Sequence, residues 1–194
     1  MRDLNQWATF KHTHRSFNFQ ETVSDHLVQE LGQIAHTVLG QDTRAVFVQD
    51  KILIERIYDH SELPNNDQFK FENFSHRKNS QLLAPLLVMV EVVDQTNKRV
   101  MSMKAGQFYS KAAHHVIAQG WQTGFCICFE HHLVEQMLFD SGYLANNRYT
   151  GPIPFFCIGH HDPSVPWNFQ QKDINRLIGT YDKHIPAEAY ITVT

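Results

Sequence analysis

Apolar residues recur at helical spacing between Ser24 and Gly40. Intervals of three and four residues place them on one face of a helix. Serine commonly caps a helix N-terminus, and glycine commonly ends a helix because it tolerates a left-handed backbone. The pattern therefore predicts an amphipathic helix between these residues, with an apolar face made of Leu27, Val28, Leu31, Ile34, Ala35 and Val38.

Of the next three apolar segments, two indicate strands and one is ambiguous. Residues 45–48 predict a short buried strand, whereas residues 51–58 fit helix and strand periods equally imperfectly, so both interpretations stay open. Residues 82–93 are rich in Leu and Val and predict a central strand. Pro85 belongs at the beginning of that strand, where no ladder hydrogen bond is required.

Helical and extended patterns alternate through the second half. Residues 104–119 predict a second long helix that stops at Gly120, and residues 131–139 predict a shorter one. Residues 153–158 predict a strand that ends at Gly159.

Length and composition favour one domain. The 194 residues, 42% of them hydrophobic, can bury one substantial core, so we expect a single domain over residues 1–194. Residues from about 59 to 80 are polar and rich in turn formers, which indicates an excursion over the surface. Residues from about 160 to 194 predict an extended C-terminal segment.

Charge and cysteine content narrow the partners and the compartment. A formal net charge of −3 with dispersed basic residues argues against nucleic-acid binding. Without a signal-like or membrane-spanning run, we expect a cytoplasmic protein that does not contact a membrane. Cys126, Cys128 and Cys157 match neither a disulfide framework nor a CxxC motif, so we expect reduced thiols.

Three segments distant in the sequence suit one phosphorylated ligand. Residues 14–16, His-Arg-Ser, combine an imidazole, a permanent cation and a hydroxyl, a set that binds phosphate. Residues 120–124 follow the second long helix with two glycines, where the backbone can approach a flat ligand. Residues 159–161, Gly-His-His, follow the last strand. Each segment taken alone is also compatible with an ordinary cap, turn or polar surface.

Other kinds of site receive less support. Paired histidines at 114–115, 131–132 and 160–161 raise the possibility of a zinc hydrolase, but no HExxH spacing is present, so we assign no metal site. No nucleophile elbow surrounds a serine or cysteine. The polar excursion contains three aromatic residues that either pack or line a substrate pocket, namely Phe69, Phe71 and Phe74.

The chain resembles the FMN-dependent nitroreductase family from about residue 10 to residue 172, because these segments occur in the family's order. Family members begin with a basic-basic-Ser segment that binds the phosphate and ribityl groups of FMN. His14, Arg15 and Ser16 stand at those positions, and Asn18 stands where another basic residue is usual.

The resemblance assigns further cofactor contacts. Residues 120–123 resemble the family's Gly-x-x-Thr turn, and residues 127–130 stand where a strand presents backbone amides to flavin N5, which implies contacts from Ile127 and Cys128. The remaining residues implied are Gln41 and Thr43, in place of an Asn-x-Gln-Pro-Trp motif at the pyrimidine edge, Lys172 as a second phosphate ligand, and Arg176 as its alternative.

The resemblance implies an α+β sandwich, with a mostly antiparallel central sheet flanked by helices, that forms a homodimer around FMN. The implied activity transfers hydride from NADH or NADPH through FMN to a nitroaromatic, a quinone or a similar acceptor. Phe69, Phe71 and Phe74 would bind that acceptor, and no general acid is assigned. The alternative is a non-catalytic flavin-binding or protein-interaction member of the same fold.

Overall fold

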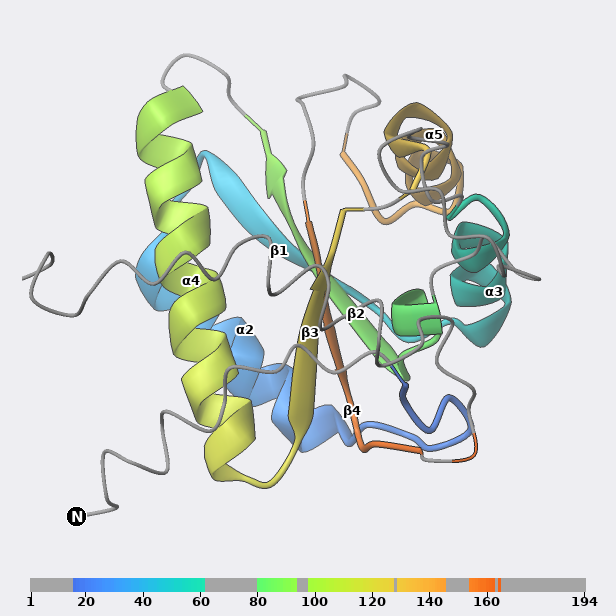
Figure 1. Ribbon diagram of the computed structural model, residues 1–194. Coiled ribbons are helices and arrows are strands. Elements are labelled where there is room, and N and C mark those ends of the chain that lie inside the picture. Colours follow the sequence, from blue (N-terminus) through green and yellow to red (C-terminus); the bar gives the residue numbers. More distant parts are fainter. Residues whose placement is uncertain are drawn as a thin grey trace, which may run out of the picture.

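A central sheet of four antiparallel strands organises the computed structural model (Figure 1). The structure describes residues 16–61, 80–93, 98–127, 129–145, 154–162 and 164. The strands lie in the order β1-β2-β4-β3, which places β2 and β4 in the middle. Their bounds are Thr43–Val48 for β1, Leu86–Val92 for β2, Gln122–Cys126 for β3 and Phe155–Gly159 for β4.

Two helices cover each face of the sheet (Figure 1). The helices α2, Asp25–Leu39, and α4, Lys98–Ala118, pack on one face. The shorter helices α3, Lys51–Asp59, and α5, His131–Asp140, cover the other face together with a 3-10 turn at Ser80–Leu82. The expected α+β architecture, with an antiparallel sheet flanked by helices, is confirmed.

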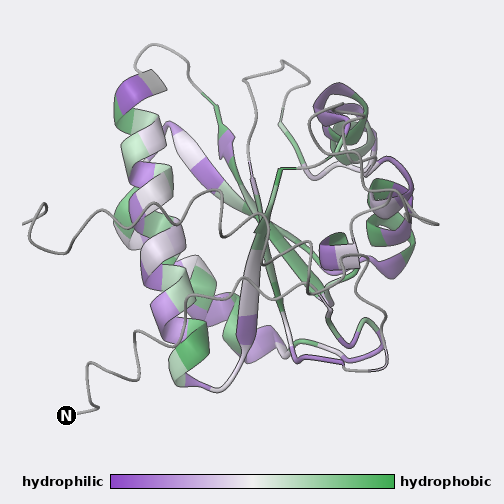
Figure 2. Cartoon of the chain, viewed as in Figure 1, coloured by the Kyte–Doolittle hydropathy of each residue, from purple (hydrophilic) through white to green (hydrophobic). Residues whose placement is uncertain are grey.

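The central strand β2 divides its side chains between the two cores. Leu86, Val88 and Val90 pack against α2 and α4, whereas Leu87 and Met89 pack toward α3 and α5. This alternation follows from the two-residue period of a strand. Because both faces are covered, β2 is apolar at nearly every position, and Figure 2 shows the central strands mainly in green. Burying each such side chain stabilises the fold by roughly 1.5–3 kcal/mol.

The predicted caps of α2 are confirmed. The hydroxyl Oγ of Ser24 accepts a hydrogen bond from the Leu27 backbone N–H at 3.3 Å. Gly40 follows the helix with φ of +76°, a left-handed value that favours glycine. The second long helix, α4, ends close to Gly120 as predicted, but it begins at Lys98, six residues before the predicted start at Lys104.

The ambiguous segment 51–58 is helical. The Asp50 carboxylate accepts hydrogen bonds from the backbone N–H groups of Ile52 at 2.9 Å and Leu53 at 3.2 Å, and so caps α3. The inward face of α3 carries Leu53, Ile54 and Ile57.

The strand predicted at residues 127–130 is wrong for the described residues of that range, Ile127, Phe129 and Glu130, none of which is extended in the sheet. The ladder with β4 runs from Gln122 to Cys126, and Phe129 then turns into the core, where its ring lies 5.1 Å from that of Phe155. Ile127 is 56% exposed and follows the strand directly.

Other predicted elements agree with the structure. The predicted strand at 45–48 is confirmed as part of β1, and the short helix at 131–139 is confirmed as α5. Most of the polar excursion at 59–80 lies outside the described residues. Within the described residues, none of the helices combines the length and the apolar character that crossing a membrane requires.

Candidate functional site

Three segments distant in the sequence meet at one end of the sheet, and we call this place the junction. It consists of residues 16–21, 121–122 and 159–162. The first and third segments run antiparallel: the backbone N–H of Asn18 donates to the His160 carbonyl at 2.8 Å, and that of Asp162 donates to the Ser16 carbonyl at 3.3 Å. The side-chain oxygen of Gln122 accepts from the His161 backbone N–H at 2.9 Å.

Because residues 16–18 pair antiparallel with residues 160–162, the junction side chains alternate between two faces. Phe17 lies opposite His161, so the side chains of Ser16, Asn18 and His160 alternate to the other face. Phe17 is buried in the core beneath α3 and α5. A Cβ added at Gly159 would lie only 3.0 Å from the Phe17 ring, which agrees with this arrangement. Ser16, Asn18 and His160 therefore share the face of the pairing turned away from Phe17.

A carboxylate fixes the imidazole of His160. Glu21 accepts hydrogen bonds from the His160 backbone N–H at 2.5 Å and pairs with its ring Nδ1 at 2.7 Å. The ring of Trp121 stacks on this imidazole with centroids 4.2 Å apart. Because Nδ1 faces the Glu21 carboxylate, it carries a proton, and the other nitrogen, Nε2, is the atom that remains for a ligand.

Two predicted cofactor residues lie in the junction. Ser16 is buried, and its backbone carbonyl also contacts Nδ1 of His161 at 3.1 Å. The side-chain oxygen of Asn18 accepts from the Gln20 backbone N–H at 3.2 Å. The other predicted residues at this end of the chain, and several elsewhere, lie outside the described residues: His14, Arg15, Phe69, Phe71, Phe74, Cys128, Lys172 and Arg176.

Gln41 and Thr43 lie at the opposite end of the sheet. Thr43 pairs with Val92, the last residue of β2, whereas the junction adjoins Leu86, the first, through Ile158 of β4. The length of β2 separates these ends by about 20 Å. Gln41 is exposed, and the hydroxyl of Thr43 donates to the Leu39 carbonyl at 2.7 Å. A single chain therefore does not bring Thr43 beside Ser16.

Sequence reasoning did not assign the pair of Glu21 and His160. The two residues are 139 positions apart, and nothing in the segment around Glu21 indicates its partner. The sequence does single out the Gly-His-His segment and the turn at Trp121. The structure brings the first to Ser16 and the second to the histidines of that segment.

The described thiols do not suit nucleophilic chemistry. Cys126 and Cys157 are free and buried, as expected for reduced thiols. Burial raises the pKa of the Cys157 thiol far above its ordinary value, since the thiolate would lose its hydration. The neutral thiol is a poor nucleophile.

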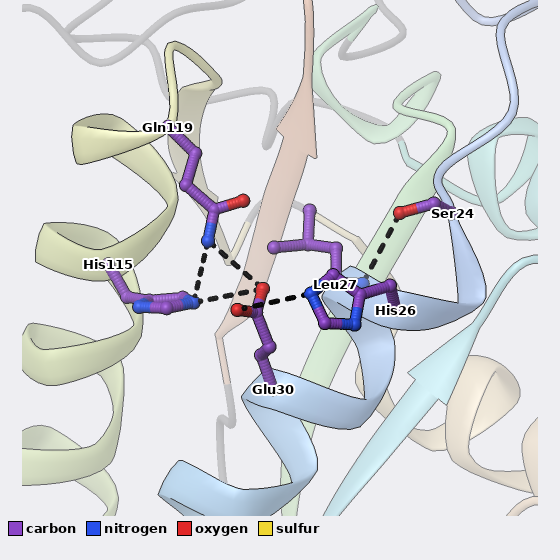
Figure 3. Close-up of polar contacts among 6 residues, drawn as sticks. All are labelled: Ser24, His26, Leu27, Glu30, His115 and Gln119. Carbon is purple, nitrogen blue, oxygen red and sulfur yellow. Dashed lines mark hydrogen bonds and ion pairs between the residues drawn. The ribbon is translucent and has the colours of Figure 1, made fainter.

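A second polar cluster joins α2 to α4 (Figure 3). The Glu30 carboxylate pairs with His115 at 3.2 Å and with His26 at 3.5 Å, and it accepts a hydrogen bond from Gln119 at 3.0 Å. The bonds from Gln119 and then His115 lower the pKa of Glu30. Among the described residues, no group of three or more His, Cys, Asp or Glu side chains is arranged to hold a metal ion. The cluster ties the two long helices together.

Solved nitroreductases have a similar fold. The FMN-bound nitroreductase of Desulfitobacterium hafniense DCB-2 matches over 100% of both chains, with a TM-score of 0.65 and 17% identity. The FMN-bound nitroreductase of Bacteroides fragilis NCTC 9343 matches over 100% of both chains, with a TM-score of 0.65 and 10% identity.

A putative NAD(P)H:FMN oxidoreductase of Staphylococcus epidermidis ATCC 12228 is similar over 88% of this chain and 92% of its own, with a TM-score of 0.59 and 11% identity. No protein-family model and no curated protein matches the sequence. The likeness to solved structures defines the class: this chain has a nitroreductase-like fold.

Proposed function

We propose that the protein is a cytoplasmic, homodimeric FMN-dependent oxidoreductase that transfers hydride from NADH or NADPH to a nitroaromatic, a quinone or a similar acceptor. One observation carries the proposal: the whole chain shares its fold with two nitroreductases whose structures contain FMN. The junction supports it, because two of the residues predicted to bind the FMN phosphate and ribityl groups, Ser16 and Asn18, lie there.

The chemistry of the junction fits a phosphate monoester. Ser16 offers a hydroxyl and Asn18 an amide on the face that also carries His160. Arg15 is the neighbour of Ser16 in the sequence, and a guanidinium binds phosphate oxygens through a fork of donors. The described junction residues include two carboxylates: Glu21 is paired with His160, and Asp162 accepts hydrogen bonds from Ser164.

Each part of the chain has one task in this proposal. His14, Arg15 and Ser16 bind the phosphate from one side, and Lys172 or Arg176 binds it from another. FMN, when bound, supplies the redox chemistry, because it takes hydride from NAD(P)H and passes it to the acceptor. In this proposal the backbone at Ile127 and Cys128 tunes the flavin by hydrogen bonding, with Ile127 following β3 at the end opposite Gln122.

The distance between Thr43 and the junction supports a homodimer. Thr43 lies about 20 Å along the sheet from the junction, as counted along β2. In this proposal Gln41 and Thr43 therefore contact the flavin bound at the junction of a second copy of the chain, so neither copy alone completes the site. The acceptor then binds above the flavin against Phe69, Phe71 and Phe74.

A visible absorption spectrum tests the proposal. The freshly purified protein is mixed with FMN, desalted, and then treated with NADH or NADPH in the absence of oxygen. We expect flavin absorption bands to remain after desalting and to bleach when the nicotinamide is added.

Two results would count against this function. Retained flavin without bleaching favours the alternative of a non-catalytic flavin-binding protein. A folded protein that stays colourless after exposure to FMN removes flavin chemistry altogether. Circular dichroism of the same sample confirms that it is folded.

A further inference from the structure

We propose that His160 contributes a phosphate contact that is made only when its imidazole is protonated, so that the junction binds FMN in a pH-dependent manner. This inference rests on the proposed function and adds a specificity-determining residue to it. It concerns the half-exposed His160 side chain, which the resemblance to nitroreductases did not include among the cofactor residues.

The first argument is the fixed orientation of the ring. Glu21 pairs with Nδ1 at 2.7 Å, and Trp121 stacks on the ring at 4.2 Å. These contacts hold the imidazole on two sides before any ligand arrives, so less conformational entropy is lost on binding. The side chain of His160 is 48% exposed, whereas that of Glu21 is 16% exposed. The imidazole therefore faces solvent, and its carboxylate partner is largely covered.

The second argument is the atom left for a ligand. With Nδ1 protonated and turned to Glu21, the neutral ring presents a lone pair at Nε2, which repels an anion. The imidazolium presents an N–H there, which donates a charge-assisted hydrogen bond to a phosphate oxygen. Within the described part of the chain, no hydrogen bond engages Nε2. One protonation step therefore converts this atom from an acceptor into a donor.

The third argument is the position of the ring. His160 lies opposite Asn18 in the antiparallel pairing, and Ser16 lies two residues before Asn18 on the same face. Two residues of an extended strand span about 7 Å, which is short enough for one phosphate group to contact neighbouring side chains of that face. His161 points to the opposite face and so provides no equivalent contact.

Other charged groups around the junction have different partners. Lys51 of α3 donates to the Gln20 carbonyl at 2.9 Å, and His161 contacts the Ser16 carbonyl through Nδ1. On α2 and α4, Glu30 is paired with His26 and His115. Asp162 lies opposite Ser16 in the pairing and therefore shares this face with His160, and its carboxylate is engaged by Ser164.

FMN and riboflavin differ only by the phosphate, so comparing their affinities measures the contribution of the phosphate to binding. Dissociation constants for both flavins are measured by flavin fluorescence at pH 6 and pH 8.5, for wild type, His160→Gln and His132→Gln. His132 is an exposed histidine on α5, away from the junction, and serves as the matched control. Thermal unfolding confirms that the variants are folded.

At pH 6 we expect His160→Gln to weaken FMN binding about tenfold or more, the effect of one charged hydrogen bond, and to change riboflavin binding by less than about twofold. At pH 8.5 the two proteins should bind FMN alike. Taking the ratio of variant to wild type removes the titration of the phosphate itself, whose second pKa is about 6. His132→Gln should match wild type throughout.

The experiment distinguishes failure of the proposed function from failure of the proposed role of His160. If wild type binds neither flavin, the proposed function falls, and this inference falls with it. If wild type prefers FMN to riboflavin and His160→Gln keeps that preference at both pH values, only this inference is overturned. Histidine ¹⁵N spectra of wild type, recorded between these two pH values at pH 7, give a test without a variant: FMN, but not riboflavin, should move Nε2 of His160 toward the protonated range, and an unchanged signal overturns the inference.

Discussion

Replacing Gly159 by alanine should destabilise the protein, because the new methyl group has no space. Its Cβ would lie 2.6 Å from Cδ of Pro85, 3.0 Å from Cγ of the same ring and 3.0 Å from Cδ1 of Phe17. Carbon atoms pack best at about 3.5–4.0 Å, so the closest contact is too short by about 1 Å. The proline ring cannot rotate away as a flexible side chain would.

Overpacking of this kind costs about 1–3 kcal/mol. In a protein of 194 residues, each kcal/mol lowers the melting temperature by about 2–4 °C. Urea denaturation followed by circular dichroism measures the change in unfolding free energy. Gly106→Ala on α4 is the matched control, because a Cβ there meets nothing within 4 Å and alanine favours a helix by about 0.8–1.0 kcal/mol.

The two glycine variants should therefore shift stability in opposite directions. If Gly159→Ala were as stable as wild type, Pro85 and Phe17 would not pack on this glycine as described. Because Gly159 also pairs with Gln122 at the junction, a shift of the β4 end should weaken flavin binding in the same variant.

Three further changes test other features. Glu135 is buried, and burial raises its pKa from 4.5 to about 7, so the folded state is stabilised below pH 4.5 relative to higher pH and loses this advantage as pH rises to about 7. Glu135→Gln should gain stability over wild type across that range, by up to about 3 kcal/mol, and a pH-independent difference in urea denaturation would contradict the assignment. Arg44→Ala leaves the buried Glu91 carboxylate without its guanidinium partner, although the Ala145 N–H still donates to it, and should cost about 1–3 kcal/mol in unfolding free energy, with partial recovery when Glu91→Gln is added. Arg15→Ala should weaken FMN binding by about 1.5–3 kcal/mol in a fluorescence titration, and unaltered affinity would refute its phosphate role.

Local signals predicted the elements whose ends are set by nearby residues. Ser24 and Gly40 bound α2 because their capping preferences act within a few residues of the chain. Residues 51–58 stayed ambiguous because their helix depends on a cap at Asp50 and on packing against the core. The end of β3 could not be predicted, since its pairing with Phe155 is determined by a strand almost thirty residues away.

The site was predictable in part, for the same reason. The resemblance singled out Ser16 and Asn18 from the order of motifs along the chain, and the structure brings them to the Gly-His-His segment. Neither motif order nor spacing indicates that Glu21 holds His160, because that contact depends on the meeting of two distant segments.

The position of β4 within the sheet has a consequence for how the protein is made. Among the described strands β4 is synthesised last, yet it alone connects β3 to the antiparallel pair of β1 and β2. During translation, the first three strands leave the ribosome while the sheet still lacks one of its two middle strands. Contacts between residues so far apart in sequence form slowly, and until they form the apolar edges are open to misassembly. Because the same segment carries Gly159 and His160 to the junction, a nascent chain forms the junction only when its sheet is complete.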